Sequence, residues 1–401
     1  MNKMLDARDT RLIADASAHV AGAQTPPQKQ RQIVLVFQGG GALGAYQAGV
    51  YQALHEAAVE PDWIIGTSIG AINASLIAGN EPENRLDRLE EFWRRMQRKE
   101  LGTPWTWRGL SDTTSYWSTL LGGIPGFFEP NPFALLGAHY PLGHDKAGFY
   151  STAPLERTLS ELVDFKLVER CKPRLTVGAA HVRTSEMRYF DSRETAITAR
   201  HIMASGALPP AFPAVRIDGE LYWDGGILSN TPTEAIFDDD PRRNSLIFAV
   251  HMWNPMGSEP ETIWEVLHRQ KDIQYSSRVA SHIARQRQAH KLRHVVSELV
   301  KHIPEGERND PIVKDLAEYG CRTQMHVVQL LAPRLDNENH TKDIDFSPGG
   351  IRQRWEAGYA DTMRAVRRAA WDDDCDPLEG VILHGPMPDT VAGRIGVAAE
   401  K

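Results

Sequence analysis

The sequence predicts an α/β fold whose central sheet is mostly parallel. Two apolar runs carry this prediction, at residues 33–37 and 63–65, because each leads into a glycine-containing turn and then a helical pattern. Runs that are apolar throughout are typical of strands buried on both faces. A repeated strand–turn–helix unit favours parallel strands joined by right-handed crossovers. At 401 residues, the chain is long enough to bury a large core.

The other elements follow from the same patterns, in chain order. Apolar residues recur at helical spacing over 42–58, and the small or apolar residues of 70–78 predict a buried helix. Further helices are expected at 85–100 and 155–163, and further strands at 175–179, 187–190 and 246–251. Beyond residue 262 the chain is expected to be mainly helical, with one strand at 325–331 and a last helix at 351–368 before a Gly/Pro-rich tail.

Changes in composition divide the chain into three expected regions. Residues 1–31 are polar and contain Pro26-Pro27, which predicts a flexible N-terminal leader. Residues 32–255 form the first domain and include an aromatic-rich insertion at 102–148. Residues 256–401 begin within an Asn-Pro-Met-Gly sequence, at 254–257, and form a mainly helical C-terminal extension with its tail.

Composition excludes several classes of protein. The apolar (41%) and charged (24%) fractions are those of an ordinary globular protein, and a net charge of −7 gives no global reason to expect nucleic-acid binding. Three distant cysteines argue against both a disulfide framework and a zinc site. No apolar stretch approaches the ~20 residues that span a bilayer. We therefore expect a cytoplasmic protein without metal or cofactor, with peripheral contact at the inner face of the membrane left open and the oligomeric state undetermined.

Ser68 lies at the centre of a G-x-S-x-G pattern between the second strand and the second helix. Gly66 and Gly70 would relieve crowding around a strained serine backbone, and the positive end of the following helix would favour charge on the serine oxygen. This context predicts a nucleophile. The alternative is a serine that only caps a buried helix.

Glycines also follow the first strand. Gly39 and Gly44 fit the G-x-G-x-x-G pattern of dinucleotide-binding turns, but such a site needs an acid after the second strand, and here Glu60 and Asp62 precede it. Consecutive glycines instead suit an oxyanion hole, because their N–H groups can converge without interference from Cβ atoms. Nucleotide binding through this turn stays as an alternative.

Asp224, followed by Gly225 and Gly226, is the candidate base. An α/β-hydrolase triad would need a histidine, and His181 and His251 fall in or beside expected strands, where a structural role is more common. A Ser–Asp dyad is the simpler interpretation, with the glycines holding the carboxylate in a tight turn. An ordinary surface turn is the alternative.

Together these segments resemble the patatin-like phospholipase family. The matching segments are 39–44, 66–74, 204–213 and 224–226, within a resemblance that covers about residues 33–237. The resemblance implies a three-layer α/β/α sandwich, a Ser68–Asp224 dyad without histidine, and release of fatty acid from lipid esters. It also implies an oxyanion hole from Gly39, Gly40 and Gly41. Leu43 departs from the family pattern, because many members carry Arg or Lys there.

Two further regions bear on the substrate. Seven aromatic residues between the serine and the aspartate predict either a lid or acyl-chain pocket, or a locally packed insertion. They are Trp105, Trp107, Tyr116, Trp117, Phe127, Phe128 and Phe133. Residues 268–294 carry seven Lys or Arg against one Asp, which suits either an anionic membrane surface or a solvated helix face.

The function expected from these features is that of a serine acyl hydrolase that cleaves carboxylic esters of lipids. An acyltransferase or an intracellular polyester depolymerase would use the same dyad. A lipid-binding or scaffold protein with a silent dyad is the alternative outside catalysis.

Overall fold

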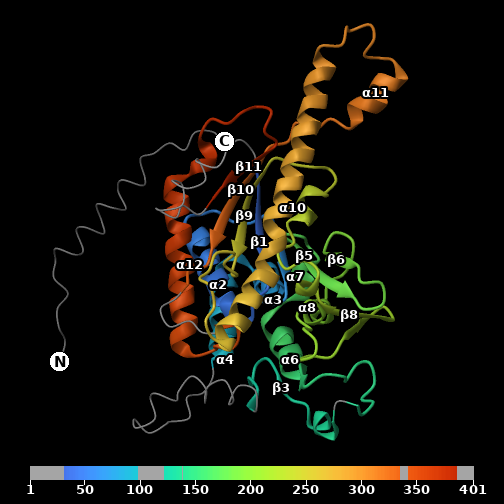
Figure 1. Ribbon diagram of the computed structural model, residues 1–401. Coiled ribbons are helices and arrows are strands. Elements are labelled where there is room, and N and C mark those ends of the chain that lie inside the picture. Colours follow the sequence, from blue (N-terminus) through green and yellow to red (C-terminus); the bar gives the residue numbers. More distant parts are fainter. Residues whose placement is uncertain (1–30, 98–121, 138, 335–341, 386–401) are drawn as a thin grey trace, which may run out of the picture. The chain divides into compact units, whose positions relative to one another are not determined.

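The computed structural model describes residues 31–97, 122–137, 139–334 and 342–385, with the backbone alone for 277–281 (Figure 1). The expected leader, apart from Arg31, lies outside the described residues, as do residues 102–121 of the insertion and the last residues of the tail. The described residues from Gln32 to Gly385 belong to one compact unit.

The elements before residue 256 begin and end as follows: β1 (Gln32–Phe37), η1 (Gly41–Gly44), α2 (Ala45–Glu56), β2 (Trp63–Thr67), α3 (Ile69–Ala78), α4 (Pro82–Met96), β3 (Glu129–Pro130), η3 (Pro132–Leu136), β4 (Tyr150–Ser151), α6 (Ala153–Leu162), α7 (Phe165–Val168), β5 (Arg174–His181), β6 (Met187–Asp191), α8 (Ala199–Ser205), β7 (Val215–Ile217), β8 (Glu220–Asp224), η4 (Gly225–Ile227), α9 (Glu234–Phe237) and β9 (Ser245–His251). The later elements are α10 (Ile263–Lys301), α11 (Pro311–Glu318), β10 (Met325–Leu331), η5 (Lys342–Ile344), α12 (Pro348–Arg368), η6 (Ala370–Asp372) and β11 (Val381–His384).

The central sheet has the strand order β11-β10-β9-β1-β2-β5-β8-β7, and β6 also pairs with β5. Pairing is parallel from β11 to β5, whereas β8 and β6 run antiparallel to β5, and β7 runs antiparallel to β8. The expected mostly parallel sheet is therefore confirmed. Because Phe37 pairs with both Gly66 and Val250, the residues that follow β1, β2 and β9 meet at one edge of the sheet.

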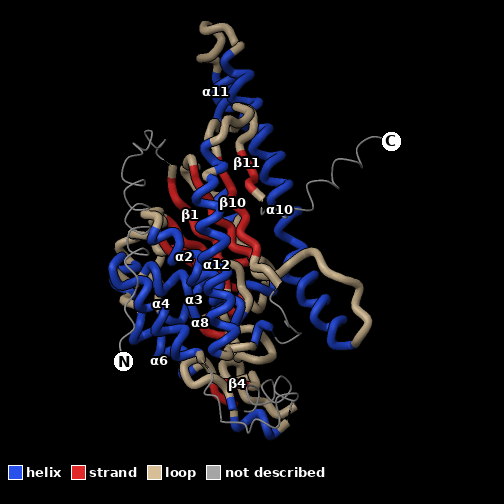
Figure 2. Tube along the Cα trace, turned by 90° about the vertical axis from the view of Figure 1, so that its left-hand side faces the viewer, coloured by secondary structure: helices blue, strands red, loops and turns tan. Residues whose placement is uncertain are grey.

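Helices cover both faces of the sheet, which gives three layers (Figure 2). Successive residues of β1 point to opposite faces, so Leu35 and Phe37 join the larger core with α2, α3 and α4, and Val34 and Val36 join a second core with α9. On the second face, α10 contacts α9 through His290 and Phe237, whose rings lie 5.8 Å apart. The α/β/α sandwich implied by the resemblance is confirmed.

The C-terminal extension continues this sheet. Strand β10 pairs with β9 along its whole length, and β11, which lies in the segment expected to be tail, pairs with β10. Helix α12 packs on α2, where the Tyr46 hydroxyl donates to Asp361 at 2.8 Å and the Trp355 indole donates to Gln52 at 2.6 Å. Residue 256 therefore marks a change of composition within one continuous sheet.

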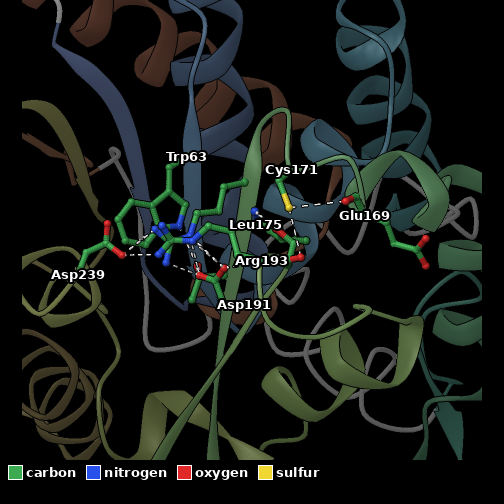
Figure 3. Close-up of polar contacts among 10 residues, drawn as sticks. Trp63, Glu169, Cys171, Leu175, Asp191, Arg193 and Asp239 are labelled. Atoms are coloured by element: carbon green, nitrogen blue, oxygen red, sulfur yellow. Dashed lines mark hydrogen bonds and ion pairs between the residues drawn. The ribbon is translucent and has the colours of Figure 1, made fainter. Parts of the chain in front are cut away.

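A buried polar network joins the strands at the end of the sheet opposite to Ser68 (Figure 3). The Arg174 guanidinium lies 3.6 Å from the centre of the Trp63 ring and pairs with Asp191 at 2.7 Å and Asp239 at 2.9 Å. Two carboxylates thus compensate a cation that is almost completely buried, which meets the condition for keeping a charge inside a fold. The network ties β2, β5 and β6 together.

Candidate active site

Ser68 occupies the turn between β2 and α3. Its backbone has φ 58° and ψ −128°, which is strained for a residue with a side chain. The flanking glycines make this turn possible, because a Cβ on Gly66 would lie 2.4 Å from the Gly70 backbone and one on Gly70 would lie 2.3 Å from the Phe37 carbonyl oxygen. The half-buried Ser68 side chain consequently stands at the N-terminus of α3, in the geometry of a nucleophile elbow.

The segment around Ser205 forms hydrogen bonds with the backbones of both candidate catalytic residues. The Ser68 N–H donates to the Ser205 carbonyl at 3.1 Å and to its hydroxyl at 3.0 Å, and this hydroxyl donates to the Gly178 carbonyl at 2.6 Å. Two residues later, the Ala207 carbonyl accepts the Asp224 N–H at 3.0 Å. Residues 204–213, which belong to the family resemblance, therefore fix the backbones of Ser68 and Asp224 relative to each other.

Asp224 ends β8, is 3% exposed, and lies beside Ser68. Its carboxyl accepts the Gly226 N–H at 2.7 Å. Burial raises the pKa of Asp224 from 3.8 to about 7, although the nearby Ser68 side chain and the Gly226 N–H lower it. The structure thus brings together two side chains that lie far apart in the sequence, and gives the carboxyl the basicity of a group that titrates near neutral pH.

The glycine-rich turn approaches Ser68 from β1. The Gly39 N–H donates to the Asn230 carbonyl at 3.2 Å, and a Cβ on Gly39 would lie 3.0 Å from the Cβ of Ser68. Gly41 has φ 57°, in the left-handed region that favours glycine. Within the described part of the chain, the N–H groups of Gly40 and Gly41 donate to no protein acceptor. Two amides of the glycine-rich turn therefore have no acceptor among the described residues, and the third is engaged.

Residues that the sequence analysis did not single out hold this turn in place. Gln38 is fully buried, and its side-chain oxygen accepts the N–H groups of Met252 at 2.5 Å and Trp253 at 3.2 Å. The Gly39 carbonyl accepts the Trp253 indole N–H at 2.8 Å and the Asn230 amide at 3.1 Å. A polar residue directly after a buried strand was the available signal for Gln38, whereas nothing local marks Asn230.

The C-terminal extension also contacts the glycine-rich turn. The Asp343 carbonyl oxygen lies 2.2 Å from the position of a Cβ on Gly41, so only a glycine fits there. The neighbouring Lys342 is 4% exposed, pairs with the fully buried Asp272 of α10 at 2.8 Å, and lies over the Trp253 ring at 5.1 Å. The extension therefore forms part of the surroundings of the site.

Of the three described aromatic residues that the sequence analysis named in the insertion, two are packed and one is exposed. Phe127 and Phe128 are buried against Phe212, with ring centres 5.9 and 5.5 Å away, whereas Phe133 is 56% exposed. Phe127 and Phe128 thus act as local core. Trp105, Trp107, Tyr116 and Trp117 lie outside the described residues.

Several cations of the basic segment 268–294 face acidic partners. Lys271 pairs with Asp343 at 2.8 Å, and Arg287 and Lys291 both pair with Glu379, at 3.3 and 3.2 Å. These pairs reduce the charge that the segment offers to an anionic surface.

No cluster of three or more described His, Cys, Asp or Glu side chains is arranged to hold a metal ion. Among the described helices, none has the length and apolar character needed to cross a membrane.

Known proteins share the region that forms this site. The chain is 27% identical over 205 residues to a patatin-like phospholipase domain-containing protein of Caenorhabditis elegans, and 26% identical over 264 residues to lysophospholipase nte1 of Aspergillus terreus. These alignments cover 51% and 60% of this chain but only 12% and 15% of those proteins, so the chain spans a small part of their length. The crystal structure of VipD from Legionella pneumophila aligns with 84% of this chain and 67% of its own, at 18% identity and a TM-score of 0.35.

Family models cover both halves of the chain. A model described as "Patatin phospholipase" matches residues 273–378, in the extension. The model described as "Patatin-like phospholipase" matches residues 35–237, half of the chain, and this range contains the glycine-rich turn, Ser68 and Asp224. The chain belongs to the patatin-like phospholipase family.

Proposed function

We propose that this protein is a serine hydrolase that cleaves carboxylic esters of lipids through Ser68 and Asp224. The observation that supports the proposal is a strained, half-buried Ser68 close to a buried Asp224, together with two amides of the glycine-rich turn that have no acceptor in the described structure. The family supports a lipid ester as the substrate class.

In the first half of the reaction, the Ser68 oxygen bonds to the ester carbonyl carbon while its proton passes to the Asp224 carboxylate. A pKa of about 7 makes this carboxylate a far better base than an aspartate in water. The negative charge that develops on the carbonyl oxygen is stabilised by the N–H groups of Gly40 and Gly41. Gly39, whose N–H is engaged by Asn230, acts by keeping the turn close to Ser68.

The intermediate then collapses. The bond from the carbonyl carbon to the alcohol oxygen breaks, and Asp224 returns its proton to this oxygen, so that the alcohol leaves and an acyl-serine remains. In the second half, water gives a proton to Asp224 and bonds to the acyl carbon. Release of the fatty acid, with return of the proton to Ser68, restores the enzyme.

A fluorophosphonate probe tests the proposal, because it bonds covalently to activated serines. We expect the full-length protein to be labelled, Ser68→Ala to lose all labelling, and its ester hydrolysis to fall at least a thousandfold. Ser160→Ala is the matched control, since Ser160 is an exposed serine on α6. Labelling that persists in Ser68→Ala, or hydrolysis at the wild-type rate by Asp224→Asn, would overturn the assignment.

A further inference from the structure

The Gly39 carbonyl, in the glycine-rich turn, accepts two hydrogen bonds from side chains. The Trp253 indole N–H donates at 2.8 Å and the Asn230 amide donates at 3.1 Å. This carbonyl belongs to the same peptide group as the Gly40 N–H, which is one of the two amides without an acceptor among the described residues. Hydrogen bonds to a carbonyl polarise the whole peptide group, so its N–H becomes a stronger donor. Both side chains therefore act on an amide of the proposed oxyanion hole.

Trp253 is fixed in the position from which it makes this contact. It lies two residues after β9, is 3% exposed, and donates its backbone N–H to the Gln38 side chain at 3.2 Å. Its ring lies 4.9 Å from that of Tyr275 on α10. An indole N–H can only donate, so a buried tryptophan needs an acceptor, and here the acceptor is the Gly39 carbonyl. The hydrogen bond is thus part of the packed interior.

A buried cation of the extension lies over the Trp253 ring. The Lys342 Nζ is 5.1 Å from the ring centre, which is within the range of cation–π attraction. A positive charge at the face of the ring withdraws electron density from the indole, so the indole N–H becomes a stronger donor. Lys342 is only 4% exposed, and solvent therefore screens this effect weakly.

The glycine-rich turn has no cation of its own. Residues 38–44 contain no Lys, Arg or His, and Leu43 lines one small pocket together with Lys342. Lys342 pairs with Asp272 at 2.8 Å, but Asp272 also faces Arg334 at 3.6 Å, so this carboxylate is shared between two cations. The extension therefore supplies positive charge beside the turn.

We propose that Trp253 is a positioning residue of the oxyanion hole, which orients and polarises the peptide group of the Gly40 N–H, and that Lys342 strengthens Trp253 as a donor. This inference rests on the proposed hydrolase function. In the transition state, charge develops on the ester carbonyl oxygen, and a stronger N–H stabilises this charge more than it stabilises the neutral ester. Loss of Trp253 or Lys342 should therefore lower kcat and leave KM nearly unchanged.

Two esters that differ in one atom test the inference: a nitrophenyl ester of a fatty acid, and its thionoester, in which sulfur replaces the carbonyl oxygen. Sulfur is a weak hydrogen-bond acceptor, so the thionoester gains little from the amides. We expect Trp253→Phe to lower kcat for the ester about tenfold, with KM and the thionoester kcat each changed less than about twofold. Lys342→Met, which keeps an apolar stem, should lower the ester kcat about threefold with the same selectivity.

Trp63→Phe is the matched control. Trp63 is 1% exposed, its indole donates to Thr176 at 2.8 Å, and the Arg174 guanidinium lies 3.6 Å from its ring centre, but it begins β2 at the end of the sheet opposite to Ser68. The control should lose about as much thermal stability as Trp253→Phe and keep the wild-type ratio of ester to thionoester kcat. A purely structural loss in Trp253→Phe would lower both rates together.

The outcomes are distinguishable. Equal losses on the ester and thionoester in Trp253→Phe, or no loss on the ester, would overturn the inference. An unchanged rate ratio in Lys342→Met would overturn the role of the extension, and this variant decides alone if Trp253→Phe does not fold. A labelled wild-type protein that hydrolyses both esters equally fast would also overturn the inference, while the serine nucleophile would stand. Absence of both labelling and hydrolysis in the wild type would overturn the proposed function itself.

Discussion

Replacing Asp224 by asparagine should make the protein more stable, and by an amount that grows with pH. Asparagine has nearly the same shape, and its side-chain oxygen can still accept the Gly226 N–H, which donates to Asp224 at 2.7 Å. Its amide can donate to the Ser68 hydroxyl. The substitution therefore removes the ionisation of a buried carboxyl and leaves its hydrogen bonds satisfied.

The size of the effect follows from the pKa of Asp224, which is 3.8 in the unfolded chain and about 7 in the folded protein. Because the folded pKa is higher, the folded state holds the proton more tightly than the unfolded state. The resulting stabilisation is complete below pH 3.8 and is lost as the pH rises through about 7. At about 1.4 kcal/mol per pKa unit, the loss amounts to about 4 kcal/mol above pH 7.

Urea unfolding of the wild type and Asp224→Asn, at a series of pH values between 5 and 9, measures this loss directly. The difference in the free energy of unfolding should increase by about 1.4 kcal/mol per pH unit up to pH 7 and then level off. Asp87→Asn, which removes an exposed carboxylate on α4, is the matched control. A difference that stays constant with pH, or an Asp224→Asn protein that is less stable at pH 8, would refute the view that this carboxyl is buried and hard to ionise.

Two other predictions follow. If Asp224 accepts the proton of Ser68, kcat/KM for ester hydrolysis should rise tenfold per pH unit below neutrality and level off above about pH 7; a flat profile from pH 5 to 8 would contradict this. Gly41→Ala should lower the melting temperature more than Gly137→Ala. Both glycines have positive φ, but only at Gly41 would the new methyl group meet a carbonyl oxygen, that of Asp343 at 2.2 Å; melting curves for the two variants decide between strain alone and strain with a clash.

The parts of the fold that could be predicted are those with a local cause. The run at residues 33–37 is apolar at every position because β1 is buried on both faces. The turn at Ser68 could be recognised because both glycines that its geometry requires, Gly66 and Gly70, lie within two residues of the serine in the sequence. Strand β11 was missed, since four residues in a Gly/Pro-rich segment become a strand only by pairing with β10.

The parts of the site that could not be predicted depend on contacts between distant segments. Consecutive glycines indicated three available amides, but Asn230 engages the Gly39 N–H from 191 positions away. Likewise, counting Lys and Arg over 268–294 could not show that Glu379 pairs with two of these cations. Composition gives the charges of a segment, whereas their partners are set by tertiary structure.

Burial of Asp224 connects the stability of this protein with its proposed chemistry. An aspartate in water, with a pKa near 3.9, is too weak a base to take a serine proton at neutral pH, and the proposed dyad has no histidine to do so. Burial of Asp224 raises the pKa of its carboxyl and so makes the carboxylate a stronger base. The same burial lowers the free energy of unfolding when Asp224 is ionised, which is the active form. Asp224→Asn should restore the stability that is lost in this way. A stabilising effect of Asp224→Asn and a kinetic midpoint near pH 7 would therefore have one physical cause, so observing either without the other would show that this cause is misassigned.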